Sequence, residues 1–346
     1  MEAKTVLQTL FDKQNLNYEQ SQQVMRGIMH GDYTNVQIAG ILTALRMKGE
    51  TAEEIAGLSQ AMQELTFPIE QAPDAIDVVG TGGASFKTFN VSSMSGLVLG
   101  SMGIKVAKHG NRSNTSKCGS ADFLEAIGIN LRLDPQRASN VLNSQNFVYL
   151  FAPFYHRSMK HAIIARKELQ ARTVFNILGP LTNPMRVQQS LIGVFDPDLL
   201  ELVADSLNQR GHARAAVIHN EHGADEILNN GITKVVEINS GKKDSYELTV
   251  EDFGLKELPK VELRNRTVKG SLRQALKIMD GEITPLAEFC AINSAMAMRL
   301  AGKGQDLEDN TEQILNHIAT GEIRQYVNQL VYATGGKLAV ELSQAA

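Results

Sequence analysis

The sequence predicts an α/β fold: a small all-helical N-terminal domain plus a large α/β domain with a mainly parallel central sheet flanked by helices. Three observations predict it. Residues 1–67 show helical periodicity throughout. From Asp77 onward, short apolar runs alternate with helical segments, as expected for parallel strands and crossover helices. Two of these strands run into polar, glycine-containing loops, which places a candidate binding site at the carboxyl edge of the sheet.

The first 67 residues are expected to form four helices. Apolar residues recur at helical spacing in each one, and Gly31 and Gly49 supply stops. Thr51 and Glu54 form a capping box, and Pro68 ends the run. Because four short helices bury little apolar surface alone, we expect the bundle to pack on a larger body or on a second copy of itself.

Six strands are expected in the rest of the chain, at 77–79, 104–107, 147–150, 191–195, 214–218 and 233–238. One intervening helix is opened by Asp134-Pro135, an N-cap followed by proline at the first helical position. Residues 239–268 are charged and turn-rich and are interpreted as a small antiparallel excursion. Helices then run from about 270 to 334.

The composition is that of a globular protein of 346 residues, 43% hydrophobic and 21% charged, with a net charge of −4. This charge argues against a general nucleic-acid surface, yet residues 105–117 contain four cations and no acid, and residues 157–186 contain six cations and one acid. Two cysteines are too few for a disulfide framework, and neither a membrane span nor a signal pattern is found. We expect a cytoplasmic protein without nucleic-acid or membrane partners.

Two strand–loop–helix units follow one another between residues 77 and 120. The first strand leads into Gly80-Thr81-Gly82-Gly83 and then Asn90-Val91-Ser92-Ser93, and the second into Lys108-His109-Gly110-Asn111-Arg112. Glycines let backbone N–H groups approach a ligand, and a helix N-terminus adds a positive dipole. Neither loop has the Walker A or the G-x-G-x-x-G pattern, and one such loop alone is more often an ordinary turn. Two in succession, with the local cations, predict a phosphate site.

An acidic pair, Asp225-Glu226, follows the strand at 214–218. In a loop the two carboxylates can converge on a hard cation such as Mg²⁺, although such a pair is also typical of a solvated turn. Its place at a strand end, facing the cationic loops, favours a metal site, so that we weigh a metal site and a solvated turn equally. His219 and His222 lack the further ligands of a zinc site and are interpreted as structural or exposed.

A third feature comprises residues 151–161 and 172–184. Aromatic residues beside Pro153 would form an apolar slot, with His156 and Arg166 as polar anchors. Arginine suits a carboxylate because its fork can bind both oxygens. Alternatively, the apolar side chains belong to the core, and a helix over 158–169 directs Arg166 to solvent unless a ligand or second domain meets it.

Together these motifs closely resemble anthranilate phosphoribosyltransferase. The resemblance covers nearly the whole chain in order and rests on 77–90, 108–112, 120–122, 151–153, 172–184 and 225–226. It implies the fold shared with the pyrimidine nucleoside phosphorylases and a homodimer joined through the helical part. It also implies a helical domain at 1–72, with about 160–190 packing into it, and a donor-binding α/β domain at 73–159 and 191–346.

The resemblance implies transfer of the phosphoribosyl group from phosphoribosyl diphosphate (PRPP) to the amine of anthranilate, in tryptophan biosynthesis, with Mg²⁺ as cofactor. Lys108, Asp225 and Glu226 would be catalytic, and Ser92, Asp225 and Glu226 would hold the metal. PRPP would contact Gly80, Thr81, Gly82, Gly83, Thr88, Asn90, Val91, Ser92, Ser93, Lys108, His109, Gly110, Asn111, Ser116, Gly119 and Ser120. Anthranilate would contact Gly80, His109, Asn111, His156, Arg166 and Gly179.

The chain departs from the family pattern at four places. Ala84-Ser85 stands where Asp-Gly is usual, residues 114–118 differ from the usual serines, Arg157-Ser158 replaces a Pro-Ala pair, and Ala224 replaces a larger apolar residue. The first and third lie where donor and acceptor should meet. Three alternatives stay open: a same-fold transferase with another aromatic acceptor, an enzyme like pyrimidine nucleoside phosphorylase, and a non-catalytic nucleic-acid-binding paralogue.

Overall fold

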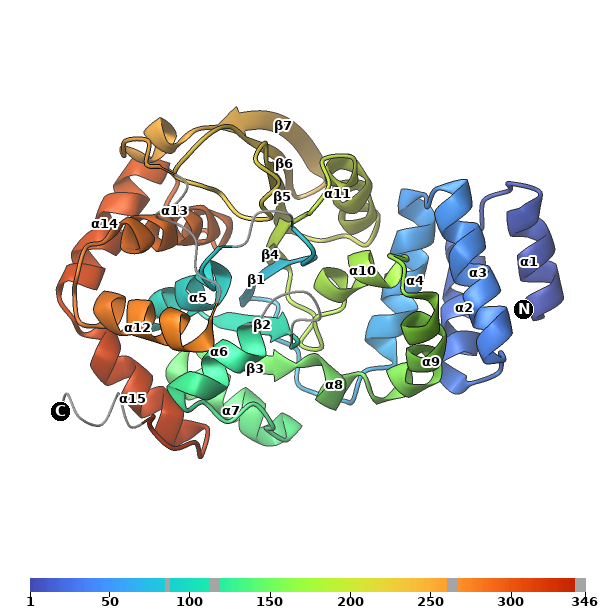
Figure 1. Ribbon diagram of the computed structural model, residues 1–346, viewed down its shortest axis with the longest axis horizontal. Helices are drawn as coiled ribbons and strands as arrows, with labels where there is room; N and C mark the ends of the chain where they lie inside the picture. Colours follow the sequence, from blue (N-terminus) through green and yellow to red (C-terminus); the bar gives the residue numbers. More distant parts are fainter. Residues whose placement is uncertain (85–87, 113–118, 260–266, 340–346) are drawn as a thin grey trace.

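The computed structural model describes residues 1–84, 88–112, 119–259 and 267–339. A bundle of helices lies beside a larger body in which helices cover a central sheet (Figure 1). Within the described ranges, no helix has both the length and the apolar character needed to cross a bilayer. The predicted fold class is confirmed.

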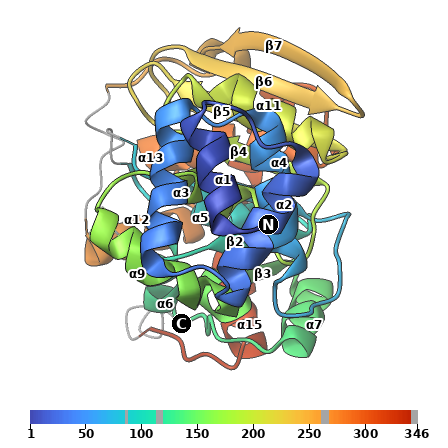
Figure 2. The ribbon, with the colours of Figure 1, turned by 90° about the vertical axis from the view of Figure 1, so that its right-hand side faces the viewer.

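The N-terminal bundle consists of α1 (Ala3–Phe11), α2 (Tyr18–His30), α3 (Asn35–Lys48) and α4 (Ala52–Glu64). The last three begin with capping boxes, in which Asn17, Thr34 and Thr51 cap the helices with their side chains. A helix from much later in the chain, α9 (Lys160–Leu169), lies against this bundle (Figures 1 and 2). The bundle therefore packs on the rest of the molecule, one of the two arrangements that its small size requires.

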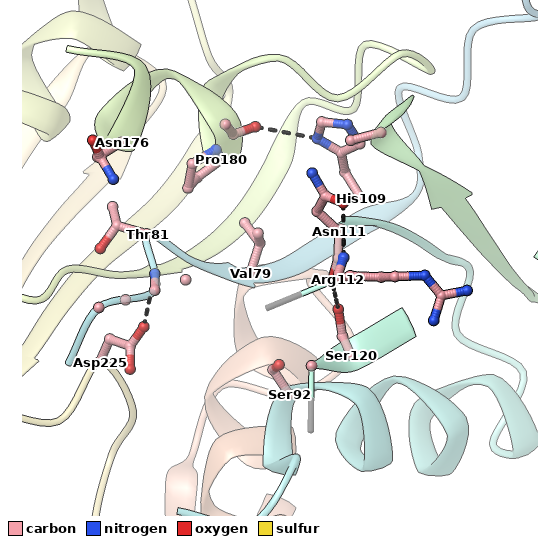
Figure 3. Close-up of a pocket in the computed structure, with 18 of the residues that line it drawn as sticks. Val79, Thr81, Ser92, His109, Asn111, Arg112, Ser120, Asn176, Pro180 and Asp225 are labelled. Carbon is pink, nitrogen blue, oxygen red and sulfur yellow. Dashed lines mark hydrogen bonds between the residues drawn. The ribbon is translucent and has the colours of Figure 1, made fainter. Parts of the chain in front are cut away.

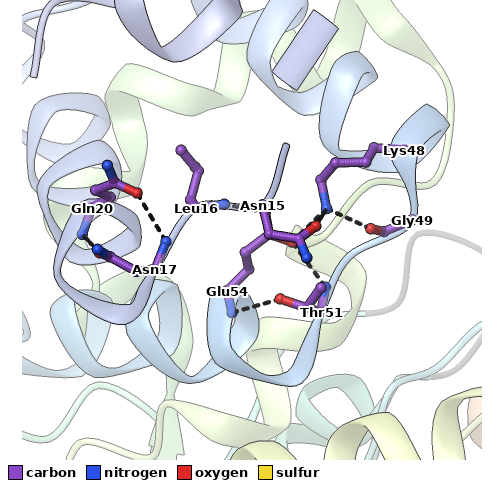
Figure 4. Close-up of polar contacts among 8 residues, drawn as sticks. All are labelled: Asn15, Leu16, Asn17, Gln20, Lys48, Gly49, Thr51 and Glu54. Carbon is purple, nitrogen blue, oxygen red and sulfur yellow. Dashed lines mark hydrogen bonds and ion pairs between the residues drawn. The ribbon is translucent and has the colours of Figure 1, made fainter. Parts of the chain in front are cut away.

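Glu54 connects three segments of the bundle. Its buried carboxylate accepts hydrogen bonds from Leu16 N at 2.9 Å, Thr51 N at 2.8 Å and Lys48 Nζ at 2.9 Å (Figure 4). Lys48 also donates to Asn15 Oδ1 and to the Gly49 carbonyl. Because removing one partner of such a buried pair costs about 3–5 kcal/mol, this group stabilises the bundle at a distance from the α/β body.

The sheet has seven strands in the order β3-β2-β1-β4-β5-β6-β7. They are β1 (Ile76–Gly80), β2 (Val106–Gly110), β3 (Phe147–Phe151), β4 (Gln189–Gly193), β5 (Arg214–Asn220), β6 (Thr233–Asn239) and β7 (Lys242–Leu248). The first five in this order run parallel, β6 is antiparallel to β5, and β7 is antiparallel to β6. Each predicted strand overlaps an observed one. The antiparallel excursion expected in residues 239–268 contains β7, which pairs antiparallel with β6 and extends the main sheet.

Alternation along the strands gives the sheet two buried faces. Leu191 and Ala216 join the core that also contains α5 (Val91–Ser101) and α13 (Pro285–Leu300), whereas Ile192 and Val217 join the core of α11 (Leu199–Gln209) and the bundle. The remaining longer helices are α6 (Ser120–Ile127), α7 (Pro135–Gln145), α12 (Val268–Met279), α14 (Leu307–Ala319) and α15 (Ile323–Ala333). Short helices α8 (Ala152–Tyr155) and α10 (Phe175–Leu178) flank α9.

The chain direction across the sheet reverses between β1 and β4. From β1 the chain moves to β2 and β3 on one side, and then returns to β4 and β5 on the other. In open parallel sheets such a reversal leaves a crevice beyond the carboxyl ends of the two strands. Gly80 and Gly193 are paired at this edge, so the fold itself marks the position for a ligand.

Candidate active site

A cavity of about 1110 Å³ lies at this crevice. Its wall comes from the ends of β1, β2 and β4, the start of α5, and residues of α8, α9 and α10 (Figure 3). Ligand pockets in proteins typically measure about 300–1,000 Å³. The cavity is therefore large enough for more than one small molecule.

The structure brings nearly all the sequence-predicted site residues together around this cavity. It is lined by Gly80, Thr81, Gly82, Gly83, Thr88, Asn90, Val91, Ser92, Lys108, His109, Gly110, Asn111, Gly119, Ser120, His156, Arg166, Gly179, Asp225 and Glu226. Ser93 differs: it is fully buried and does not line the cavity, because successive residues at the start of α5 point about 100° apart and Ser92 takes the cavity side. Ser116 lies outside the described residues.

The first glycine turn packs directly against the Asp225 loop. Gly82 and Gly83 have φ values of +66° and +79°, which favour glycine, and Gly82 N donates to Asp225 Oδ2 at 3.2 Å. A Cβ atom on Gly80 would lie 2.5 Å from the same carboxylate oxygen. The glycines thus allow the acidic loop to approach the end of β1, and this approach carries Asp225 and Glu226 to the cavity.

An all-oxygen group of potential ligands surrounds this approach. Thr88 Oγ1 donates to Glu226 Oε1 at 3.1 Å, and Ser92 Oγ lies at the start of α5 and lines the same cavity. No cluster of three His, Cys, Asp or Glu side chains occurs in the described ranges. Two carboxylates with a hydroxyl suit Mg²⁺, which keeps water and phosphate oxygens as its other ligands. The residues present fit this ion.

Lys108 carries a buried positive charge beneath the donor loops. Its Nζ donates to the Val78 carbonyl and, at 3.1 Å, to Ser92 Oγ. Burial lowers the pKa of Lys108 to about 8, although Asp77, Glu226 and Asp225 oppose this change. Burial raises the pKa of Asp77 to about 6, and Lys108 opposes that shift. An anionic ligand at this end would therefore stabilise the charged form of Lys108.

Two neutral histidines form the opposite part of the wall. The rings of His109 and His156 lie 5.0 Å apart, and His109 Nδ1 is 3.1 Å from the Gly179 carbonyl oxygen. Burial lowers the pKa of His109 well below its usual range and that of His156 to about 4. The Nε2 atoms of both rings are buried without a hydrogen-bond partner among the described residues. Both nitrogens therefore suit hydrogen bonding to a ligand rather than charge stabilisation.

Arg166 points into the cavity from α9 rather than to bulk solvent. Its guanidinium lies 4.9 Å from the centre of the Phe175 ring, and burial lowers its pKa. No ion pair involving it is found in the part of the chain that the structure describes. A half-buried cation without a counter-ion favours an anionic ligand such as a carboxylate.

The charge argument from residues 105–117 needs correction. Lys105 pairs with Asp74, and Arg112 pairs with Asp122 and Glu125, while Lys117 lies outside the described residues. Lys108 is therefore the residue of that segment whose charge is directed at the site. The acidic partners of Lys105 and Arg112 lie outside residues 105–117, so a count of cations in that segment overstated the positive charge near the site.

Sequence reasoning gave no role to Arg172 and Asn176, which also line the cavity. Arg172 Nη2 donates to the Gly83 carbonyl at 2.8 Å, and the guanidinium lies 4.0 Å from the centre of the Phe195 ring. It thereby holds the first glycine turn from the side of α10. Both residues belong to the segment 172–184. Their polar side chains in a largely apolar segment were the sequence signal that could have indicated a role in the site.

His219 and His222, interpreted as structural or exposed, both lie against neighbouring protein groups. His219 is buried with Nδ1 2.8 Å from the Val194 carbonyl oxygen, and His222 Nε2 lies 2.8 Å from Asn230 Oδ1. Two residues that differ from the family pattern can be located near the site. Ala84 is buried, and the Arg157 guanidinium lies 4.2 Å from the centre of the Phe67 ring.

Two family models match the chain. The model described as glycosyl transferase family, a/b domain, covers residues 72–324, and the helical bundle domain of the same family covers residues 4–66. The anthranilate phosphoribosyltransferase of Petrotoga mobilis is 39% identical over 329 residues, or 95% of this chain and 96% of the relative. That of Endomicrobium trichonymphae is 42% identical over 289 residues, or 84% and 86%.

Solved structures agree with this relationship. The anthranilate phosphoribosyltransferase from Thermus thermophilus superposes with a TM-score of 0.90 at 36% identity, covering 95% of this chain and 99% of the other. The enzyme from Saccharomyces cerevisiae in complex with PRPP and Mg has the same fold, with a TM-score of 0.86 at 23% identity over 96% and 98%. The chain therefore belongs to the glycosyl transferase family that joins this helical bundle to this α/β domain, and within it to the anthranilate phosphoribosyltransferases.

Proposed function

We propose that this protein transfers the phosphoribosyl group of PRPP to the amine of anthranilate and releases pyrophosphate, in a Mg²⁺-dependent step of tryptophan biosynthesis. The observation that carries the proposal is the division of one cavity into two chemically different ends. One end has a glycine turn, a helix N-terminus, a buried lysine and two carboxylates. The other has neutral histidines and an arginine without an acidic partner in the described chain.

At the donor end, backbone N–H groups of the glycine turn and the N-terminus of α5 would bind the diphosphate. Lys108 would stabilise the negative charge that grows on the leaving group as the bond from the ribose anomeric carbon to oxygen breaks. Mg²⁺, held by Ser92, Asp225 and Glu226, would add positive charge to the same diphosphate. The proposed donor contacts are those predicted from sequence, with Ser93 supporting α5 from the core side.

At the acceptor end, Arg166 would bind the carboxylate of anthranilate, while His109, His156, Asn111 and the open face at Gly179 would contact its ring and amine. The neutral amine attacks the anomeric carbon, and the new carbon–nitrogen bond forms as pyrophosphate departs. The amine then loses its extra proton. Since both histidines are held neutral, orientation and charge stabilisation supply most of the rate enhancement, and no strong base is required.

The proposal includes an assembly and a place of action. We place the helical domain at 1–72 with 160–190, and the α/β domain at 73–159 and 191–346. Val36 and Met47 on α3 are 82% and 81% exposed, which supports a homodimer through the bundle, testable by light scattering. The enzyme would work in the cytoplasm, where reducing conditions suit a chain with two cysteines.

The test follows the loss of anthranilate fluorescence when purified protein is mixed with PRPP and Mg²⁺. We expect turnover that needs all three additions and stops with a chelator. If the protein leaves anthranilate unchanged but consumes PRPP with another aromatic amine, phosphoribosyl transfer is retained and anthranilate is ruled out as the acceptor. Release of a free base from a pyrimidine nucleoside with phosphate would instead favour phosphorolysis.

One observation favours a different acceptor. Arg157 replaces the usual proline, lines the cavity, and contacts both the Phe67 and the Phe154 ring, at 4.2 and 5.1 Å from their centres. A second cation held in this way would suit an aminobenzoate that carries a second anionic group. The same fluorescence assay with carboxylated aminobenzoates decides between the two acceptors.

A further inference from the structure

A chain of hydrogen bonds runs behind the two histidines, from helices α11 and α4 to Asp77 near the start of β1. Gln63, the buried residue before the end of α4, stands in its middle: Nε2 donates to the Asn183 carbonyl at 2.7 Å, and Oε1 accepts from Arg210 Nη2 at 2.6 Å. The amide thus acts as a donor toward one segment and as an acceptor toward another.

Arg210 follows the last residue of α11 and is directed at neutral groups. Besides Gln63, it donates to the Leu181 carbonyl at 2.6 Å, to Ser59 Oγ at 3.2 Å and to Gln60 Oε1 at 3.3 Å. No ion pair of Arg210 occurs within the described residues. Its rigid fork therefore holds α4 and the segment 179–183 in one fixed relation.

Asn183 connects the segment 179–183 to strands β1 and β2 of the sheet. Its Nδ2 donates to Asp77 Oδ2 at 2.8 Å and to the Ala107 carbonyl at 2.7 Å. The other oxygen of Asp77 accepts from His109 N at 3.2 Å. All of these groups are buried, where each bond is costly to leave unmade.

The segment 179–183 meets the histidines on its other side. The Gly179 carbonyl lies 3.1 Å from His109 Nδ1 (Figure 3), and the Thr182 backbone is hydrogen-bonded to His156. The segment thus contacts both rings of the acceptor end, while Gln63 and Arg210, which do not line the cavity, contact the segment from behind.

We infer that Gln63 and Arg210 are positioning residues that set the acceptor end of the cavity by holding the segment 179–183. The inference rests on the proposed function for the naming of that end. The physical reason is that both histidine rings take their orientation from backbone groups of this segment, so a shift of the segment moves both Nε2 atoms together. The donor loops have no hydrogen bond to Gln63 or Arg210 within the described residues.

The test compares Gln63→Leu with Lys48→Met. Gln63→Leu keeps most of the side-chain volume but removes both hydrogen bonds. Lys48→Met instead disrupts the buried Glu54 group of the same bundle (Figure 4), and neither Lys48 nor Glu54 lines the cavity. For Gln63→Leu we expect the KM for anthranilate to rise about three- to thirtyfold, with the KM for PRPP changed less than about twofold. Lys48→Met should lower Tm and leave both KM values unchanged.

Arg210→Lys serves as a second variant if Gln63→Leu does not fold. It retains the charge without the fork and should raise the KM for anthranilate by a smaller factor. An equal change in both KM values, or a lower Tm with no change in KM, would overturn the positioning role.

Hydrogen exchange separates this inference from the proposed function. Backbone amides of residues 176–183 and His109 should exchange faster in Gln63→Leu than in Lys48→Met, whatever the acceptor is. Wild-type protein that consumes no anthranilate contradicts the proposed function alone if this exchange difference is found. Unchanged exchange in an active protein with unaltered KM values contradicts the inference alone.

Discussion

The two ends of the cavity differ in how the chain builds them. The donor end comes mainly from residues 80–92 and 108–111, with Asp225 and Glu226 brought in across β4. The acceptor end combines β2 with one later stretch of the chain, residues 156–183, which holds the residue after α8, helix α9 and the segment after α10. The glycine turn of the donor end thus depends on local geometry, whereas the two carboxylates of that end and the whole acceptor end depend on packing between distant segments.

This difference also appears in the electrostatics. At the donor end charged groups of opposite sign interact, since the Lys108 ammonium group is near the carboxyl groups of Asp77, Asp225 and Glu226. At the acceptor end burial keeps two histidines neutral and leaves Arg166 without an acidic partner in the described chain. Substitutions should therefore separate the two ends kinetically, and the following predictions test that separation.

The largest effect is expected at the acidic pair. Asp225→Asn combined with Glu226→Gln should lower kcat by about 10³-fold or more, because the negative charge that attracts Mg²⁺ to the diphosphate is removed. The measurement is turnover across a Mg²⁺ titration. Wild-type rates at every Mg²⁺ concentration would remove these carboxylates from the metal site and make the two ends less distinct.

Arg166→Ala should act on the acceptor alone. We expect the KM for anthranilate to rise about 10- to 100-fold, the magnitude of a lost hydrogen bond to a charged group, with donor binding nearly unchanged. Calorimetric titration with each substrate measures both. Arg166→Lys, which retains the charge but not the fork, should fall between the two. Equal losses for both substrates would contradict the assignment.

Gly80→Ala and Gly179→Ala should affect different substrates: the first should raise the KM for PRPP, and the second should leave it unchanged. The first places a Cβ atom 2.5 Å from Asp225 Oδ2, so the Asp225 carboxylate must shift from its place beside the glycine turn, and the KM for PRPP should rise about tenfold. At Gly179 nothing lies within 4 Å of an added Cβ, so folding and the KM for PRPP should be retained and any change should be confined to anthranilate. The same direction of change in both variants would argue against separate ends.

The smallest effect concerns stability rather than turnover. The pKa of His156 is about 4 in the folded protein and near 6.5 when exposed. Between these values the unfolded chain binds more protons, so the free energy of unfolding should fall by up to about 3 kcal/mol as pH drops from 6.5 to 4. His156→Gln should reduce this slope in urea melts at several pH values. An unchanged slope would show that His156 is not held neutral.

Much of the donor end was predictable because its residues lie close together in the sequence. Glycines at positive φ, a strand running into a polar turn and a hydroxyl at a helix start are all local features. The roles of the acceptor residues were inferred through resemblance, and the orientation of Arg166 was not predicted from the helix pattern. Ser93 was included among the donor contacts through the resemblance, and its burial on the core side of α5 became visible only in the structure.

By itself the sequence determined the fold class, the capped helices of the bundle, each strand before β7 to within a few residues, and the two polar loops, since these follow from periodicity and from residues within one turn of each other. The tertiary structure decided which cations are neutralised by distant acids, that Arg166 faces the cavity, and that Gln63 and Arg210 lie behind the histidines. The physical reason is that burial and charge pairing depend on segments that meet only when the chain folds.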